Sequence, residues 1–296
     1  MKGVLAPIFE PGFFASSPVH VALLVGGLVA VVSGVVGVFT VVRGQSYAGH
    51  ALADLSVTGG SGSVLIGISP LWGFAGTSVA AAGIMDLIGV QRPRGRDLAT
   101  GIVRGAGLGL AALLLYWDTV HTSTTGATIT ILFGSMFTID SSVIGIVVAF
   151  SVAAVGIVAV LYRPLLLSSV SSDLAIVRGV RPRLAGAACL IAIALATSLS
   201  ALTIGAILST ALLVGPAATA LRLTARPGLV LAWSALIGLV ATWLGILLAY
   251  DSYYWPPAGH GWPVSFFVVF LILIFYLVAQ ARPGRNARPA AAEAGG

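Results

Sequence analysis

The stretch VGGLVAVVSGVVG, residues 25–37, decides the fold class, because none of its side chains is charged and only Ser33 is polar. It lies inside an apolar run from 17 to 42, longer than the roughly 20 residues with which a helix crosses the hydrocarbon core of a bilayer. Its glycines would let neighbouring helices approach closely in lipid. The stretch therefore predicts a tightly packed transmembrane helix.

The composition of the whole chain agrees with this prediction. Of 296 residues, 58% are hydrophobic and 8% are charged, whereas charged residues make up about 25% of an ordinary soluble domain. We expect an all-α polytopic membrane protein, with a single transmembrane domain over residues 1–281 and a disordered cytoplasmic tail over 282–296. An eight-span count, with one short segment re-entrant, stays open beside a count of nine. The nine apolar runs are 17–42, 48–68, 71–90, 98–117, 142–162, 184–202, 203–222, 228–250 and 263–281.

Basic residues mark every second connection between these runs. The connections near 69, 118–141, 202 and 251–262 contain no Lys or Arg. By the positive-inside rule the arginine connections are cytoplasmic, which places the C-terminus inside and, with nine spans, the N-terminus outside. The formal charge of +6 is therefore spread over loops, which argues against a nucleic-acid partner. The arginines of these connections are Arg43, Arg92, Arg94, Arg96, Arg163, Arg178, Arg181, Arg183, Arg222, Arg226, Arg282, Arg285 and Arg288.

The chain has no obvious energy source of its own. A phosphate-binding Walker loop needs a lysine after its glycines, and the only lysine here is Lys2. The protein is therefore not expected to be an enzyme that hydrolyses ATP. If it transports against a gradient, it needs either a separate ATPase or coupling to an ion through carboxylates within the membrane.

The longest cytoplasmic connection, residues 163–183, contains a pattern that predicts a short helix. Ser171 or Ser172 is a suitable N-cap, Asp173 lies in the first turn, and Gly179 is a suitable C-terminal stop. The apolar residues between them are Leu174, Ile176 and Val177. Such a helix could lie on the membrane surface or bind a partner protein.

The stretch SYAGHALAD, residues 46–54, places His50 and Asp54 one helical turn apart in an otherwise apolar run. At this spacing the two side chains share one face of a helix. An unpaired carboxylate within the membrane costs on the order of 2 to 3 kcal/mol, so Asp54 should face the protein interior and have a partner. Imidazole and carboxylate both suit zinc and manganese. The two residues either contact a metal ion in transit or form a pair that only holds the helix in place.

One proline lies inside a predicted span. Pro216, in TALLVGPAATALRL (residues 210–223), removes a helix hydrogen bond and predicts a kink.

Five stretches in order resemble the permease subunits of bacterial ABC importers for zinc, manganese and iron. They are GVFTVVRGQSYAGHALADLSVTGG (37–60), DLATGIV (97–103), LFGSMF (132–137), SSDLAIVRGV (171–180) and TIGAILSTALLVGPAATALRL (203–223). The resemblance runs from about residue 20 to 280.

This resemblance implies a permease of the bacterial plasma membrane that works as a homodimer. It implies a P-loop ATPase subunit as the power source, an extracytoplasmic metal-binding protein that delivers the ion, and zinc or manganese as transported substrate rather than a bound cofactor, with zinc the first expectation. The helix near 171–180 would then be a coupling helix for the ATPase, through Asp173, Leu174, Ala175, Val177 and Gly179.

The sequence departs from the family pattern at the candidate ligands. The family has Asp-x-x-x-His where this chain has His50-x-x-x-Asp54, and proline where this chain has Thr58. In a two-fold dimer with this face on its axis, two copies would supply two His and two Asp, a tetrahedral set for zinc. The remaining histidines, expected near the outer surface as possible metal entry sites, are His20, His121 and His260.

Other transport classes fit the sequence less well. A secondary transporter would need inverted repeats and several coupling carboxylates near the midplane, and a channel would need a pore-lining repeat or a ring of charge. An ABC importer for a metal chelate or another small organic ligand is the closest alternative, and it would need neither His50 nor Asp54. The ligand types leave zinc, manganese and ferrous iron undecided.

Overall fold

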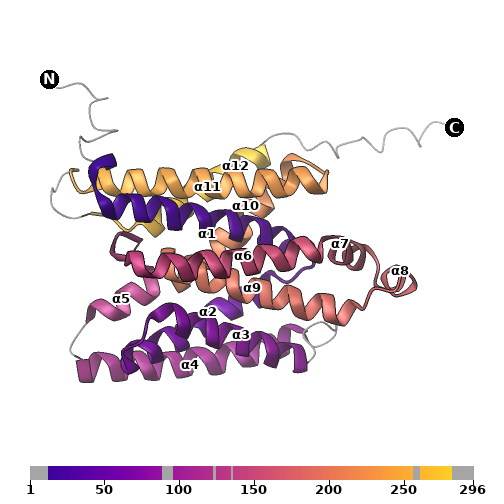
Figure 1. Ribbon diagram of the computed structural model, residues 1–296, viewed down its shortest axis with the longest axis horizontal. Coiled ribbons are helices and arrows are strands. Elements are labelled where there is room, and N and C mark those ends of the chain that lie inside the picture. The colour runs from indigo at the N-terminus through magenta and orange to yellow at the C-terminus, as the bar shows by residue number, and fades with distance from the viewer. Residues whose placement is uncertain (1–12, 89–95, 123–124, 135, 256–260, 282–296) are drawn as a thin grey trace.

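The computed structural model of the protein (Figure 1) describes residues 13–88, 96–122, 125–134, 136–255 and 261–281, and these residues form helices and no strand. The long helices are α1 (Ser17–Val42), α2 (Ser46–Ile66), α3 (Pro70–Ile88), α4 (Arg96–Thr122), α6 (Ile144–Val160), α9 (Pro182–Ile204), α10 (Ala206–Leu223), α11 (Pro227–Ser252) and α12 (Val264–Ala281). The short ones are α5 (Thr125–Phe133), α7 (Tyr162–Val170) and α8 (Ser172–Val177), with 3-10 turns η1 (Phe13–Ala15), η2 (Met136–Thr138) and η3 (Ser141–Val143).

Each predicted span coincides with one long helix, which confirms the all-α polytopic membrane fold. Within the described residues, 8 helices are long and apolar enough to cross a membrane. The remaining long helix, α2, is less apolar because it carries His50, Asp54 and several Ser, Thr and Gly residues. It packs against α3, α4, α9 and α10, so most of its polar side chains lie within the bundle. The described chain thus has eight apolar spans and one polar helix among them.

Helix α9 forms the centre of the bundle. It contacts α1, α2, α3, α6 and α10, and residues 192–201 are all buried. Small residues allow close packing, as the sequence predicts. On α2 and α3, for example, a side chain at Gly59 would collide with the carbonyl oxygen of Gly73, and one at Gly73 would collide with that of Gly59. These contacts hold α2, with its polar residues, against the rest of the bundle.

The connection predicted over 118–141 contains more structure than the sequence analysis expected. Helix α4 continues to Thr122, and α5 follows from Thr125 to Phe133 and packs against α2, α4, α9 and α10. Helix α5 ends at Gly134 (φ 77°), which contacts Gly205 (φ 84°), the single residue between α9 and α10. A side chain at Gly205 would collide with the carbonyl oxygen of Leu132. Glycine is required here because only glycine adopts this backbone conformation without strain.

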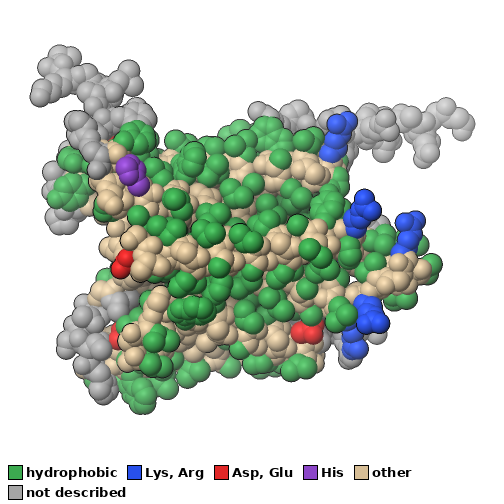
Figure 2. Space-filling view, viewed as in Figure 1, with side chains coloured by type: hydrophobic (Ala, Val, Ile, Leu, Met, Phe, Trp, Pro, Cys, Tyr) green, Lys and Arg blue, Asp and Glu red, His purple; other side chains and the backbone are tan. Residues whose placement is uncertain are grey.

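The two ends of the bundle differ in charge. On the face shown in Figure 2, the Lys and Arg side chains lie at the end that carries α7 and α8 in Figure 1. Helix α1 begins at the opposite end and runs toward them. This arrangement agrees with the predicted alternation of basic and uncharged connections. The predicted disordered tail, residues 282–296, lies outside the described residues, and a single domain over 1–281 stays a prediction.

Candidate functional site

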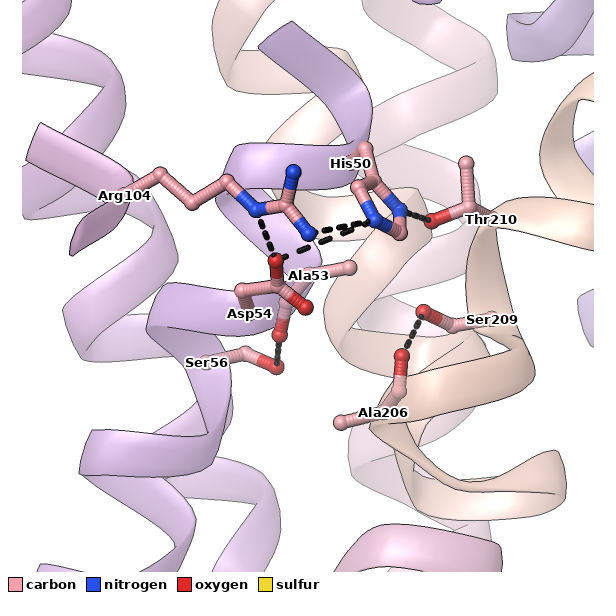
Figure 3. A network of polar contacts seen from close by, with 8 residues as sticks. All are labelled: His50, Ala53, Asp54, Ser56, Arg104, Ala206, Ser209 and Thr210. Atoms are coloured by element: carbon pink, nitrogen blue, oxygen red, sulfur yellow. Dashed lines mark hydrogen bonds and ion pairs between the residues drawn. The ribbon is translucent and has the colours of Figure 1, made fainter. Parts of the chain in front are cut away.

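The candidate ligand pair lies inside the first half of α2. This helix begins at Ser46, after a tight connection in which Gly44 has φ 63° and the Gln45 amide donates to the Thr40 carbonyl oxygen at 2.8 Å. Asp54 is therefore about 12 Å along the helix axis from the basic end. The one-turn spacing brings His50 Nε2 to 3.9 Å from Asp54 Oδ2 (Figure 3). The two side chains share one helical face, as predicted.

Arg104 of α4 occupies the space beside both side chains. Its Nε donates to Asp54 Oδ2, and its Nη2 lies 2.9 Å from His50 Nε2 (Figure 3). The guanidinium carbon also lies 5.9 Å from the centre of the Tyr47 ring. The expectation that Asp54 is buried and partnered is confirmed, and its partner is an arginine from a separate helix. From the sequence alone, the position of Arg104 near the cytoplasmic end of its apolar run predicts that it snorkels or pairs rather than binds substrate, and the structure shows it paired.

These contacts determine which nitrogen of His50 carries the proton. A guanidinium can only donate hydrogen bonds, so His50 Nε2 accepts from Arg104. The proton is then on Nδ1, which donates to Thr210 Oγ1 of α10 at 2.9 Å. His50 is therefore neutral, with the lone pair of Nε2 directed toward Arg104 and Asp54. A neutral imidazole whose other nitrogen donates to an oxygen is the form that binds transition metals.

Helices α2 and α4 are joined by a second contact one turn further along. Thr58 Oγ1 donates to the Gly107 carbonyl oxygen at 2.9 Å. Thr58 is the residue at which the resembled family pattern has proline, and proline could not make this bond. The bond and the ion pair together hold Arg104 at the height of His50 and Asp54.

The cluster of His50, Asp54 and Arg104 is open on one side. The relative exposures of the side chains are 35% for His50, 29% for Arg104 and 11% for Asp54. Polar groups at this depth are not found against lipid, because hydrocarbon cannot solvate them. The open side must therefore face water or another protein surface.

One copy of the chain offers few ligands to a metal ion. No group of three or more His, Cys, Asp and Glu side chains comes together within the part of the chain that the structure describes. His50 and Asp54 supply two donor atoms, which is half of a tetrahedral set. A complete site would need donors from elsewhere, such as water or a second copy.

The predicted cytoplasmic helix is present as α8. Ser171 is its N-cap, with its Oγ accepting from the Leu174 amide at 3.4 Å, and Gly179 (φ 76°) follows its end. Leu174 and Val177 are 56% and 85% exposed, whereas Ala175 is completely buried. Leu174 and Val177 thus form an exposed apolar surface. The Ala175 side chain, also expected at the ATPase contact, packs inside the protein, and the contact of this helix with an ATPase stays a prediction. Helix α7, which precedes α8, was not predicted.

The two candidate outer histidines within the described residues lie on helices other than the one that carries His50. His20 is exposed in the first turn of α1, His121 lies in the last turn of α4, and His260 is outside the described residues. Asp118, the first residue of the predicted connection 118–141, belongs instead to α4, and its side chain is fully buried. A cavity of about 440 Å³ is lined by residues of α2, α3, α5, α9 and the segment from η2 to η3, and Asp140 is among them. The Ser142 backbone amide donates to this carboxylate and holds the pKa of Asp140 below its ordinary value.

Pro216 is buried in α10, which continues through it to Leu223. Thr210 precedes it on the same helix. The predicted kink at Pro216 stays a prediction.

Comparison with known proteins agrees with this architecture. The sequence model of the ABC 3 transport family matches residues 17–279. The chain is 28% identical over 243 residues to the manganese transport system membrane protein MntC of Listeria monocytogenes, covering 82% of this chain and 85% of that protein. It is 25% identical over 226 residues to the high-affinity zinc uptake system membrane protein ZnuB of Buchnera aphidicola, covering 76% and 86%.

Two solved structures share the fold. PsaBC from Streptococcus pneumoniae in complex with Fab aligns with a TM-score of 0.76 and 24% identity, over 90% of this chain and 92% of that chain. An inward-facing candidate metal-chelate type ABC transporter aligns with a TM-score of 0.72 and 16% identity, over 95% and 92%.

Proposed function

Because the chain belongs to the ABC 3 transport family and is a multi-pass protein of the bacterial plasma membrane, we propose that it is the permease of an importer for manganese or zinc. One observation carries the proposal: a neutral His50 and the Asp54 carboxylate lie on a single face of α2, with Nε2 and Oδ2 3.9 Å apart. The names of two relatives, one a manganese and one a zinc transport protein, support this cargo.

The choice between the two metals is a matter for measurement. Zinc is the first expectation from the family resemblance, and two copies of His50 and Asp54 would make a tetrahedral set that suits it. Manganese accepts the same ligand types and tolerates additional water oxygens. Relatives named for each metal support treating both as candidate substrates.

The proposed assembly contains two copies of this chain. The open side of the cluster supports this, since a second copy placed against it would shield His50 and Arg104 from lipid and bring four ligands together. An ATPase subunit would bind α8 through Leu174 and Val177, and an external binding protein would deliver the metal to the end where α1 begins.

A metal chelate is the second candidate substrate. The observation that favours it is Arg104, a fixed positive charge beside the candidate ligands, because an anionic chelate would be attracted to a guanidinium that a bare cation would avoid. The two candidates differ in what chelation does to uptake. A bare ion should be withheld from the permease by an excess of chelator, whereas a chelate substrate should be taken up in its complexed form.

The experiment is uptake of radioactive manganese and zinc into vesicles that contain the complete complex with its binding protein and ATPase. Uptake should require ATP and should fall when a strong chelator is added. His50→Ala and Asp54→Ala should reduce uptake per assembled complex. Chelator-stimulated uptake that is unaffected by both substitutions would support the chelate instead.

A further inference from the structure

We propose that Arg104 is a tethered cation that occupies the metal position between His50 and Asp54 when no cargo is present, so that only an ion able to displace it can pass. This inference rests on the proposed metal pathway and goes beyond it by assigning a role in selectivity to a residue that contributes no ligand. The role follows from which atoms Arg104 contacts, what it excludes, and where it can move.

Arg104 uses the same two atoms that a metal would use. Its Nε binds Asp54 Oδ2 and its Nη2 lies 2.9 Å from His50 Nε2. A transition metal binds imidazole nitrogen at roughly 2.0–2.1 Å and carboxylate oxygen at roughly 2.0–2.2 Å. The acceptor nitrogen of a neutral imidazole has one lone pair, so His50 Nε2 cannot bind the guanidinium and a metal ion at the same time. Binding of metal therefore requires Arg104 to leave.

The tethered guanidinium also explains how the empty pathway keeps an ionised carboxylate at this depth. Asp54 is 8% exposed, and an anion so placed needs a positive partner. Arg104 supplies it without any ion from solution. The same contact fixes His50 as the neutral form whose Nε2 lone pair accepts from Arg104, so the tautomer is already the one that binds metal when the metal displaces Arg104.

Displacement of a bound guanidinium selects among cations by chemistry. Na⁺, K⁺ and Mg²⁺ prefer oxygen ligands and gain little from an imidazole nitrogen, whereas zinc and manganese use both donor types. An ion that can replace only the Asp54 contact leaves the His50 contact with Arg104 in place. An ion that coordinates both atoms replaces both contacts at once. Arg104 therefore discriminates against Na⁺, K⁺ and Mg²⁺.

The structure offers Arg104 a place to move. Its side chain is 29% exposed, and the Tyr47 ring, 5.9 Å away, can hold a guanidinium by a cation–π contact. The neighbouring Gly105 faces open space, and a side chain at Gly101 would meet only the Tyr47 hydroxyl, at 3.5 Å. Arg104 can thus swing along α4 toward Tyr47 without displacing another side chain of the same copy.

The test is equilibrium binding of Mn²⁺ or Zn²⁺ alone to the purified complex with its ATPase. Arg104→Gln should tighten metal binding at least about fivefold, the lower end of a typical coupling between two ligands that compete, and should let Mg²⁺ compete more effectively with Mn²⁺. Arg104→Lys, which keeps the charge but cannot contact both atoms, should lie in between. Arg222→Gln, at an exposed arginine in the last turn of α10, is the matched control and should behave as wild type.

The outcomes separate this inference from the proposed function. If His50→Ala and Asp54→Ala abolish metal binding but Arg104→Gln leaves it at the wild-type level or weakens it, Arg104 is a structural partner and the tether is refuted. If His50→Ala and Asp54→Ala keep wild-type binding, the metal pathway itself is wrong and the tether with it.

A measurement on the wild-type complex covers the case in which the Arg104 variants fail to assemble. Phenylglyoxal modifies accessible arginines, and the modified residues can be identified by mass spectrometry. Saturating Mn²⁺ or Zn²⁺ should raise the modification rate of Arg104 severalfold and leave that of Arg222 unchanged. An Arg104 rate that does not respond to metal overturns the inference.

Discussion

His50 of α2 donates from Nδ1 to Thr210 Oγ1 of α10 at 2.9 Å, across a sequence separation of 160 residues. This bond holds the imidazole in the tautomer that presents Nε2 to Asp54. A hydrogen-bond partner behind a metal-binding histidine typically matters as much for orientation as for basicity. Thr210 therefore belongs to the candidate site although it would never touch the metal.

Replacing Thr210 tests this relationship. Thr210→Val removes the acceptor and should reduce metal affinity and uptake by about 10-fold to 100-fold, as loss of such a partner does elsewhere, whereas Thr210→Ser should retain both. The matched control is Thr219→Val on the same helix, because Thr219 bonds only to the Gly215 carbonyl oxygen of α10. Equal loss in the Val and Ser variants would argue against the hydrogen bond as the cause.

Exchanging the two candidate ligands tests whether they contact the ion. His50→Ala and Asp54→Ala should each sharply reduce manganese and zinc uptake per assembled complex. The double variant His50→Asp with Asp54→His should keep substantial transport, since both ligand types still share one helical face. A merely structural pair predicts the reverse pattern: less assembled complex, and normal uptake by whatever remains.

The exposed apolar residues of α8 are expected to bind the ATPase. Leu174→Asp or Val177→Asp should abolish co-purification of the ATPase while the permease remains folded, because a charge would be buried in an apolar contact. Ala175→Asp is the informative contrast, since that side chain is buried inside the permease and its replacement should reduce the amount of permease itself. Wild-type ATPase binding by both exposed variants would place the docking surface elsewhere.

The turn between α9 and α10 should tolerate no side chain. Gly205→Ala combines an unfavourable φ of 84° with a collision against α5, and we expect a loss of roughly 2 kcal/mol or more. Gly76→Ala in α3, where a side chain meets open space, is the control and should be close to neutral. Thermal unfolding of the purified proteins in detergent measures both. Comparable melting temperatures for the two variants would contradict the proposed packing of α5 on this turn.

The source of energy can be tested with the isolated chain. Free of contaminants, it should hydrolyse no ATP, because its only lysine is Lys2 and a Walker loop needs one after its glycines. With its cognate ATPase it should form a complex of two permease and two ATPase chains, measurable by native mass spectrometry. ATP hydrolysis by the permease alone would refute the proposal that a separate subunit hydrolyses ATP.

The features that the sequence predicted well are those determined within a short stretch of chain. Hydrophobicity over one helix length identified the nine long helices of the described residues, because the cost of placing a segment in lipid is set by its own side chains. The caps at Ser171 and Gly179 located α8 because capping involves neighbouring residues. The spacing of His50 and Asp54 placed both on one face because helix geometry alone decides it.

Only the tertiary structure showed what surrounds these residues. Arg104 and Thr210 lie 54 and 160 residues from His50 in the sequence. They reach His50 because α4 and α10 pack against α2, and no local sequence pattern encodes this packing. Likewise, the sequence places Gly134 in a predicted connection and Gly205 in a predicted span, and only the packing of α5 on the α9–α10 turn brings the two glycines together. The sequence by itself determined a membrane bundle with a candidate ligand pair. The fold decided that an arginine stands between those ligands and that a threonine orients the histidine, because contacts between distant segments form only when the helices pack.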